Sequence, residues 1–256
     1  MTILQAVILG IVEGITEFLP ISSTGHLILA QRLLGMAESQ MLVSFDIAIQ
    51  SGAILAVIVL YFRMLMQRRN LWLPIIVAFI PTAIIGAALH DVAKTYLLQS
   101  TTLVTWSMLI GGIAIILFER LYRSERGRIQ SIEAIPLKTA VGIGIIQSIA
   151  IVPGVSRAAA TIIGGMLLKI DRRTIVEFSF LLAIPTMASA TGYDLLKSYQ
   201  AFNAHDALTL GIGFLMSFLT AIVAIRWLLK FIQSHSFTGF GVYRILAAIA
   251  FWMWVQ

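Results

Sequence analysis

The chain has 256 residues, of which 59% are hydrophobic and only 12% charged, and its mean hydropathy is +0.94. Soluble domains carry about 25% charged residues, so the composition excludes an ordinary soluble domain and predicts a single integral membrane domain. The formal net charge is +6, but the basic residues sit in short loops between apolar spans, which indicates membrane topology rather than nucleic-acid binding. The absence of cysteine excludes disulfides, thiolate catalysis and cysteine metal sites.

The first unusual stretch, residues 10–26, begins as an apolar helix and then breaks. Glu13 and Glu17 stand four residues apart, so their carboxylates face the same way on that helix. Pro20 ends the helix. The polar side chains that begin the next helix are Ser22, Ser23, Thr24 and His26. Ionisable groups in such apolar surroundings are candidates for a functional site.

Six apolar segments are each long enough to cross a membrane, since about 20 residues span the hydrocarbon core. They are residues 42–62, 71–90, 101–121, 174–196, 208–232 and 239–255. Two further segments, 3–34 and 137–168, each contain a helix, a proline turn and a second short helix. We predict that both are re-entrant hairpins, which enter the membrane and return to the same side. Irregular backbone at that depth is tolerated only inside protein or along a cavity.

The two hairpins resemble each other in sequence, which predicts an internal repeat in an all-α membrane fold. Residues 9–15 match residues 143–149, so that Gln147 takes the place of Glu13. Each half holds one hairpin and three crossings, an odd number, so the halves must have opposite orientations, which makes an inverted-topology repeat. The expected division is repeat one at residues 1–121, a cytoplasmic linker at 122–136 and repeat two at 137–256.

The basic residues support this topology because they form four clusters. With six crossings, all four clusters fall on one side, which should be cytoplasmic, and both termini should lie outside. The clusters are Arg63, Arg68 and Arg69; Arg120, Arg123, Arg126, Arg128 and Lys138; Lys169, Arg172 and Arg173; and Arg226 and Lys230.

The second hairpin contributes Gln147, Gly154, Ser156 and Arg157, and we expect Arg157 to be the one basic residue deep in the fold. An intramembrane arginine needs an anionic partner. The half-helices that begin near Ser22 and Ser156 would aim their N-termini at a common midplane point, where N–H groups and helix dipoles favour an anion. The planar fork of Arg157 suits phosphate oxygens.

Two carboxylates in the same pocket require a further cation, because Arg157 alone cannot neutralise Glu13 and Glu17 and also hold an anion. We therefore predict that the two carboxylates bind Mg²⁺ or Ca²⁺, with a phosphorylated ligand completing the metal's shell. Together these groups are typical of phosphoryl transfer. In that interpretation Ser23 is the nucleophile and His26 its base, and Arg157 with the helix N-termini stabilises charge.

Simpler interpretations of the same residues remain open. The hydroxyl run at residues 22–24 is also what an ordinary N-cap needs. Glu13 and Glu17 could instead form a proton or sodium relay, and Arg157 could be only a structural partner of one of them. Gln50, four residues after Asp46, could line the cavity with it or face headgroups.

At these residues the chain resembles the undecaprenyl-diphosphate phosphatases, the bacitracin-resistance membrane proteins of bacteria. The family's acidic E-x-x-x-E motif stands as Glu13 and Glu17. Its Pro-x-Ser-Ser-Thr-Gly-His run stands at residues 20–26, and its Pro-Gly-x-Ser-Arg motif at residues 153–157. The stretch at residues 177–185 is similar too, and the resemblance covers essentially the whole chain with its spacing intact.

The resemblance implies hydrolysis of undecaprenyl diphosphate to undecaprenyl phosphate and inorganic phosphate, with a divalent cation. It places the enzyme in the bacterial cytoplasmic (inner) membrane, with the active site open to the extracytoplasmic side. This reaction recycles the lipid carrier for cell-wall synthesis and confers bacitracin resistance. The implied partners are a polyprenyl diphosphate and membrane lipids, with a homodimer as a candidate assembly.

The resemblance also implies roles for individual residues. Ser23 matches the suggested nucleophile, His26 a residue that acts as base or as alternative nucleophile, and Glu13 and Glu17 the metal-linked acids. The substrate-binding residues then expected are Ser22, Thr24, Gly25, Gln147, Gly154, Ser156 and Arg157.

One departure and one alternative accompany this interpretation. The family usually continues Ser-Arg-Ser-Gly, whereas Ala158 and Ala159 follow Arg157 here, so a hydroxyl and a glycine are missing from the turn expected to cradle phosphate. The alternative function is a lipid-phosphate flippase or an ion-coupled transporter, because inverted repeats with broken helices are typical of secondary transporters. Release of phosphate from a lipid diphosphate by the purified protein distinguishes the two.

Overall fold

The computed structural model describes residues 1–37, 39–97, 100–122, 128–198 and 206–255, and these residues form an all-helical fold without a β-strand. An isolated parallel bridge joins Ile129 to Ile170. The helices of the first half are α1 (Ile3–Thr16), α2 (Ser23–Leu33), α3 (Gln40–Gln67), α4 (Trp72–Val92) and α5 (Thr101–Leu121). Those of the second half are α6 (Leu137–Gln147), α7 (Arg157–Leu167), α8 (Arg172–Ser198), α9 (Ala207–Phe231) and α10 (Thr238–Val255).

Short helical turns connect several of these helices. A 3-10 turn precedes α4 (η1, Arg69–Leu71), a second lies before α6 (η3, Ile132–Ala134) and a third follows α6 (η4, Ser148–Ile151). A π-helical turn (η2, Ala93–Leu97) continues α4. Residues 123–127 of the predicted linker, with Arg123 and Arg126, lie outside the described residues.

Five of the described helices are long and apolar enough to cross a membrane. They correspond to Met41–Gln67, Arg69–His90, Thr101–Leu121, Arg172–Tyr193 and Ala207–Phe231. The last helix, α10, is apolar but shorter. The prediction of an all-α, multi-pass membrane protein is therefore confirmed, with five to six candidate spans.

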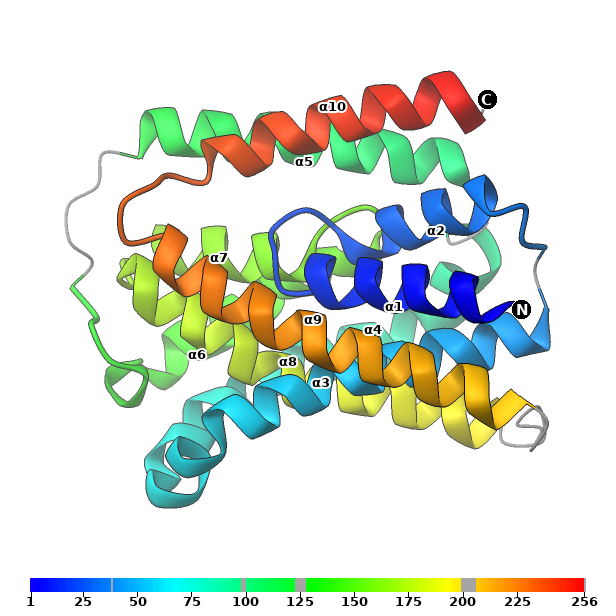
Figure 1. Cartoon of the computed structure of the whole chain (residues 1–256). Coiled ribbons are helices and arrows are strands. Elements are labelled where there is room, and N and C mark those ends of the chain that lie inside the picture. The colour runs from blue at the N-terminus through cyan, green and yellow to red at the C-terminus, as the bar shows by residue number, and fades with distance from the viewer. Residues whose placement is uncertain (38, 98–99, 123–127, 199–205, 256) are drawn as a thin grey trace.

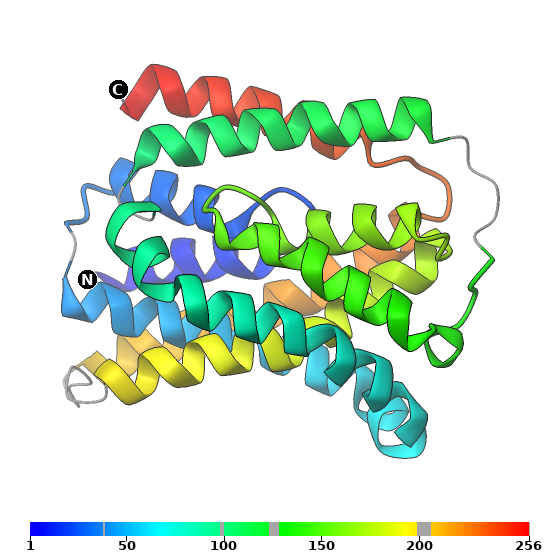
Figure 2. The same cartoon turned by 180° about the vertical axis from the view of Figure 1, so that it is seen from behind.

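The four short helices form two antiparallel pairs, α1 with α2 and α6 with α7. Figures 1 and 2 show that the turn of each pair lies midway along the long helices and that the two pairs reach this level from opposite ends of the molecule. The local sequence explains both breaks. Ser22 has a φ of 73°, which is rare for a residue with a side chain, and Gly154 has a φ of 89°, which only glycine adopts without strain.

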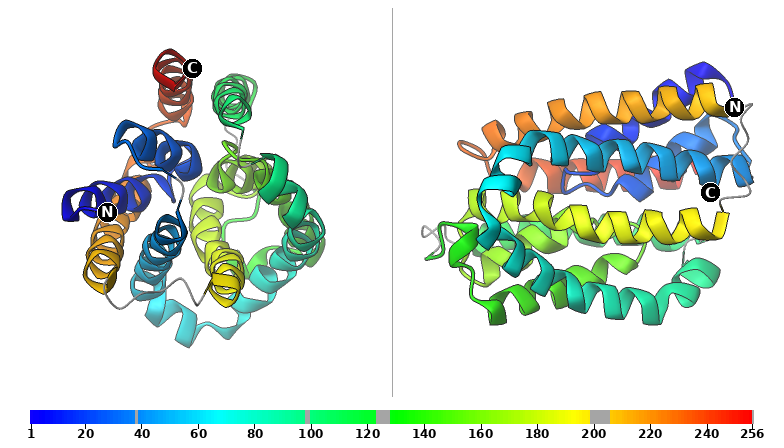
Figure 3. Two further views of the ribbon diagram at one scale, coloured as in Figure 1. Left: turned by 90° about the vertical axis from the view of Figure 1, so that its right-hand side faces the viewer. Right: turned by 90° about the horizontal axis from the view of Figure 1, so that it is seen from below.

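Each of these pairs lies against a long helix of the other half of the chain. Helix α1 packs on α9 and α6 packs on α4, while α3 contacts both α8 and α9. The approach is close because glycines face the contact: a Cβ on Gly10 would lie 2.6 Å from the Gly213 carbonyl oxygen, and one on Gly144 would clash with the Ala78 carbonyl oxygen. Gly10 therefore allows the close contact between α1 and α9. Helices α5 and α10 form a separate pair beside the others (Figure 3).

The connections that carry the basic clusters lie together. The α3–α4, α7–α8 and α9–α10 connections are at one end of the bundle in Figure 1, and both termini are at the other. A poorly exposed ion pair and a backbone hydrogen bond join segments at the basic end. Arg172 Nη2 lies 2.9 Å from Glu119 Oε2, and the Phe237 N–H donates to the other oxygen of Glu119 at 2.9 Å.

Candidate functional site

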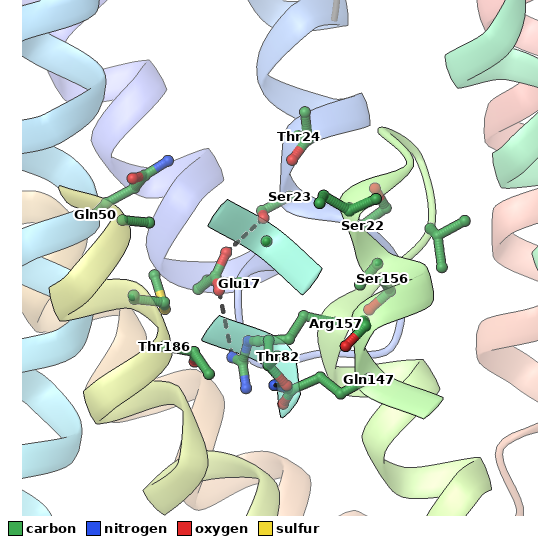
Figure 4. Close-up of a pocket in the computed structure, with 17 residues that line it drawn as sticks. Glu17, Ser22, Ser23, Thr24, Gln50, Thr82, Gln147, Ser156, Arg157 and Thr186 are labelled. Atoms are coloured by element: carbon green, nitrogen blue, oxygen red, sulfur yellow. Dashed lines mark hydrogen bonds and ion pairs between the residues drawn. The ribbon is translucent and has the colours of Figure 1, made fainter. Parts of the chain in front are cut away.

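A cavity of about 300 Å³ lies at the level where the two broken helix pairs meet (Figure 4). The α1–α2 turn and the η4–α7 turn form part of its wall, and α3, α4 and α8 supply the rest. Its polar lining residues are Glu17, Ser22, Ser23, Thr24, Gln50, Thr82, Gln147, Ser148, Ser156, Arg157 and Thr186.

Ser23 and Glu17 form the shortest hydrogen bond of the cavity. Helix α1 ends at Thr16 and α2 begins at Ser23, so the intervening turn brings the first hydroxyl of α2 back onto Glu17. The Ser23 hydroxyl donates to Glu17 Oε2 at 2.5 Å. A hydroxyl bound to a carboxylate in this way has a proton acceptor at hand, which is the arrangement that activates a serine nucleophile.

Arg157 contacts the Glu17 carboxylate from the side opposite to Ser23, as Figure 4 shows. Its Nη2 donates to Glu17 Oε1 at 3.3 Å and its Nη1 donates to the Ser179 carbonyl oxygen at 2.8 Å. The Nε of Arg157 is buried and has no hydrogen-bond partner among the described residues. Buried donors are nearly always paired, so this N–H is suited to an oxygen of a bound anion.

Two helices begin at the cavity. Ser22 precedes α2 and its hydroxyl accepts from the Gly25 N–H at 3.5 Å, while Ser156 precedes α7 and its hydroxyl accepts from the Ala159 N–H at 3.1 Å. Both serines therefore act as N-caps, whereas the Ser23 hydroxyl is engaged by Glu17. The first turns of both helices line the cavity and direct the positive ends of their dipoles at it, which favours an anionic ligand.

Gln147 is held in place by two threonines. Its Nε2 donates to Thr82 Oγ1 at 3.0 Å, and its Oε1 accepts from the Thr161 hydroxyl at 2.9 Å. Sequence reasoning missed Thr82 and also Thr186 of α8, which both line the cavity. The sequence did contain a sign of both, because Ile-Pro-Thr occurs twice inside apolar spans, at residues 80–82 and 184–186.

His26 lies outside the cavity lining. Its Nδ1 donates to the Ser22 carbonyl oxygen at 2.7 Å, and its Nε2 lies 2.8 Å from Tyr243 Oη. The two rings are also stacked, with centroids 5.5 Å apart. Both ring nitrogens are therefore engaged, and neither is bonded to Ser23.

The two glycines expected to bind substrate shape the turns instead of lining the cavity. Gly154 adopts its positive φ against the Val104 backbone, and a Cβ there would lie 2.5 Å from the Val104 carbonyl oxygen. A Cβ on Gly25 would press on the side chain of Met108. Both positions thus let the turns approach α5.

Glu13 is fully buried, and neither of its carboxylate oxygens has a hydrogen-bond partner in the part of the chain that the structure describes. It lies one helical turn before Glu17 but does not line the cavity. Asp46 is bound by the Gln31 amide at 3.0 and 3.3 Å, whereas Gln50 lines the cavity. Among the described residues no group of three or more His, Asp or Glu side chains could hold a metal. The orphaned Glu13 carboxylate and Glu17 fit a hard cation whose other ligands come from a bound molecule and water.

Ala158 and Ala159, which depart from the family pattern, are both buried and neither lines the cavity. Ala158 and Ala159 both belong to the main apolar core. A hydroxyl at either position, as the resemblance led us to expect, would therefore face the core side of α7 and not the cavity.

Arg244 corrects one expectation. It is 1% exposed and is the largest fully buried side chain of the described residues, whereas the Arg157 side chain is 14% exposed. The prediction that Arg157 is the one basic residue deep in the fold is therefore wrong. The sign in the sequence was a single arginine in the middle of the last apolar segment.

A second, mostly apolar groove of about 410 Å³ adjoins the cavity between α4 and α8. The two spaces share the wall residues Thr82, Gly86, Ile151, Thr186 and Ala190. The groove continues toward the C-terminal ends of α4 and α8, where the rings of His90 and Tyr193 meet with centroids 4.8 Å apart. The cavity, with its polar lining residues, thus continues into the mostly apolar groove.

The chain is similar to known proteins over almost its whole length. Residues 6–250 match the family model described as bacitracin resistance protein BacA. A protein of Aquifex aeolicus named undecaprenyl-diphosphatase is 51% identical over 251 residues, which cover 98% of each chain. Proteins of the same name from a Sulfurihydrogenibium species and from Persephonella marina are 49% and 46% identical, over 99% and 100% of this chain and the full length of each relative.

Proposed function

Because the chain belongs to the family of the bacitracin resistance protein BacA, we propose that its central cavity is the active site in which it works as an undecaprenyl-diphosphatase. The enzyme releases inorganic phosphate from undecaprenyl diphosphate and so returns the lipid carrier for cell-wall synthesis. The observation that carries the site assignment is the short hydrogen bond from Ser23 to Glu17, with the Arg157 guanidinium on the same carboxylate.

In the first step the Ser23 oxygen attacks the terminal phosphorus while Glu17 accepts the hydroxyl proton. The bond from that phosphorus to the bridging oxygen breaks, and undecaprenyl phosphate leaves. In the second step water attacks the phosphoserine, inorganic phosphate leaves, and Ser23 regains a proton through Glu17. The fork of Arg157 and the N-termini of α2 and α7 stabilise the charge on the transferred group.

Two observations favour Ser23 over His26 as nucleophile and Glu17 over His26 as base. Ser23 lines the cavity and is bonded to Glu17, whereas both nitrogens of His26 are engaged by the Ser22 carbonyl and Tyr243. We assign His26 a supporting role, in which it holds the first turn of α2. This serine–carboxylate pair also favours an enzyme over a carrier, because a carrier needs no nucleophile.

For the divalent cation, Mg²⁺ or Ca²⁺, we propose Glu13 and Glu17 as the protein ligands. Support comes from the buried Glu13 carboxylate, which has no other partner. Held by Glu13 and Glu17, such a cation would supply positive charge to balance that of the diphosphate.

The substrate is amphiphilic, and the two connected spaces match its two parts. We assign the diphosphate to the polar cavity and the first isoprenoid units to the apolar groove between α4 and α8. The groove leads toward the end of the bundle at which both termini lie.

We also propose that the two halves form an inverted repeat with two re-entrant hairpins, set in the bacterial inner membrane. The pairing of α1 with α9 and of α6 with α4 exchanges equivalent helices of the two halves, which supports this symmetry. The basic connections at one end support a cytoplasmic assignment for that end. The groove then opens toward the extracytoplasmic side.

Phosphate release tests the proposed function and its nucleophile together. Purified wild-type protein in detergent should release phosphate from undecaprenyl diphosphate, and Ser23→Ala should lose on the order of 10³-fold or more in kcat. His26→Gln should keep measurable turnover, because its ring is bonded away from Ser23. Full activity in Ser23→Ala with loss in His26→Gln would reverse the two roles, and no release by the wild type would exclude the enzyme.

Arg157→Lys should lose about 10²-fold in kcat/KM, because an ammonium cannot bind two phosphate oxygens as a planar fork does. Arg32→Lys, the same change on the exposed end of α2, is the matched control and should keep full activity. Thermal unfolding should show that both variants fold. Near-normal turnover in a destabilised Arg157→Lys protein would instead mean that the guanidinium only pairs with Glu17.

Glu13→Gln should raise the Mg²⁺ concentration needed for half-maximal activity, because one of two carboxylate ligands is lost. It should also reduce the rise in melting temperature that Mg²⁺ produces in the presence of a lipid diphosphate. Glu177→Gln, which alters an acid paired with Arg173 near the basic end, serves as control. Identical metal dependence in wild type and Glu13→Gln would remove Glu13 from the metal site.

Ala87→Leu should raise the KM for undecaprenyl diphosphate about tenfold, because the larger side chain enters the proposed isoprenoid groove. Turnover of a short-chain isoprenoid diphosphate should change much less. The neighbouring Ala88 is exposed and outside the groove, so Ala88→Leu should leave both KM values unchanged. Equal effects of the two substitutions would argue against this path for the chain.

Cysteine labelling tests the orientation, since the natural chain contains no cysteine. In intact cells, Arg68→Cys should resist an impermeant thiol reagent and Ala37→Cys should react, because the two positions lie at opposite ends of the bundle. The reverse pattern would invert the proposed topology.

A further inference from the structure

Arg244 of α10 is buried, and no described carboxylate lies within ion-pair distance of it. None of the ion pairs among the described residues includes it. Its guanidinium instead donates to four backbone carbonyl oxygens, those of Gly154 (2.8 Å), Ser107 (3.1 Å), Met108 (3.3 Å) and Pro20 (3.4 Å). A charged group in such a place is stable only because these dipoles replace water around it.

The space for this guanidinium is built into the facing helix. A Cβ on Gly111 of α5 would lie 2.7 Å from Arg244 Cζ and closer still to Nη2. On the next residue, a Cβ on Gly112 would lie 3.1 Å from Arg244 Cβ. The close α5–α10 contact thus leaves room at its centre for one arginine head group.

Two of the four carbonyls belong to the turns that carry the active site. Pro20 lies two residues before Ser22, the N-cap of α2, and Gly154 lies two residues before Ser156, the N-cap of α7. Ser23 and Arg157 are the first residues of these two helices. A single side chain therefore bridges the turn that presents the nucleophile and the turn that presents the phosphate-binding fork.

We propose that Arg244 is a positioning residue, which sets the placement of Ser23 relative to Arg157 by bonding both turns. It does not line the cavity, so it acts through these residues and not on the substrate. Tyr243, the neighbour of Arg244 on α10, adds a contact to the beginning of α2 through His26. This inference rests on the proposed function, because it concerns the geometry of that reaction.

The effect of losing this bridge follows from the geometry of the reaction. A displacement of about 1 Å between reacting groups can cost on the order of 10²-fold in rate. Arg244→Met, which keeps the length and apolar stem of the side chain, should therefore lower kcat about 10²-fold. Arg244→Lys should recover part of this loss, because an ammonium can donate to some of the four carbonyls.

Arg172→Met is the matched control. Arg172 is also a poorly exposed arginine that joins separate segments, through Glu119 and the His235 carbonyl, but at the basic end of the bundle. It should lower the melting temperature while kcat stays within about twofold of wild type. A loss of kcat in Arg172→Met equal to that in Arg244→Met would mean that both act only through stability, and the positioning role would fall.

A double-mutant cycle tests positioning directly. If Arg244 acts through the placement of Arg157, Arg244→Met should cost about 10²-fold in the wild type but less than about tenfold in an Arg157→Lys background. Multiplicative losses would overturn the proposal, as would a folded Arg244→Met protein with normal kcat. Measuring Ser23→Ala in parallel separates the proposed function from the positioning role. If Ser23→Ala is inactive while Arg244→Met has normal kcat, only the role of Arg244 is refuted.

If Arg244→Met and Arg244→Lys both fail to fold, Gly111→Ala can be used to test the proposal instead. The added methyl displaces the guanidinium without removing it. A folded Gly111→Ala protein should show reduced kcat, with a smaller change in KM, and an unchanged kcat would refute the bridge.

Discussion

A guanidinium and a carboxylate buried among apolar helices persist only when each meets a partner, and the ion pair of Arg157 with Glu17 satisfies that requirement across 140 residues of sequence. Removing one member of such a pair typically costs about 3–5 kcal/mol, because the other charge is left buried and unpaired. The same carboxylate also holds Ser23. The carboxylate that holds the Ser23 hydroxyl therefore also joins the two halves of the chain.

Helices that break inside an apolar bundle leave backbone groups that water cannot reach, and each must find a partner in protein. Here the partners come from other segments. Ser156 donates to the Leu19 carbonyl at 3.4 Å, so that the second turn satisfies part of the first. Arg244 donates to carbonyls of both turns. Hydrogen bonds thus join the two helix breaks, and the surrounding fold fixes the irregular backbone that forms the cavity.

The sequence alone was enough to find those cavity residues that are polar or charged within an otherwise apolar stretch. Glu17, Ser23 and Arg157 stand out because charged and hydroxyl groups interrupt apolar helices, and hydropathy alone located the long helices. Arg244 and Tyr243 were missed because their partners lie far away in sequence; Tyr243, for example, meets His26 across 217 residues. No local pattern encodes such contacts. Likewise, the three-residue spacing of Ser23 and His26 suggested a pair, but the imidazole turns back to the Ser22 carbonyl and outward to α10.

The two halves have the same plan but unequal chemistry, and their matched positions show the difference most clearly. Gln147 matches Glu13 in the sequence of the two hairpins, and each end of its amide has a partner, Thr82 or Thr161. Glu13 is equally buried but has no partner for its carboxylate. A neutral amide can be satisfied by two hydroxyls, whereas a buried carboxylate requires a proton or a cation. The first half therefore carries the two acids and the Ser23 hydroxyl, whereas the second half supplies a neutral amide and an arginine.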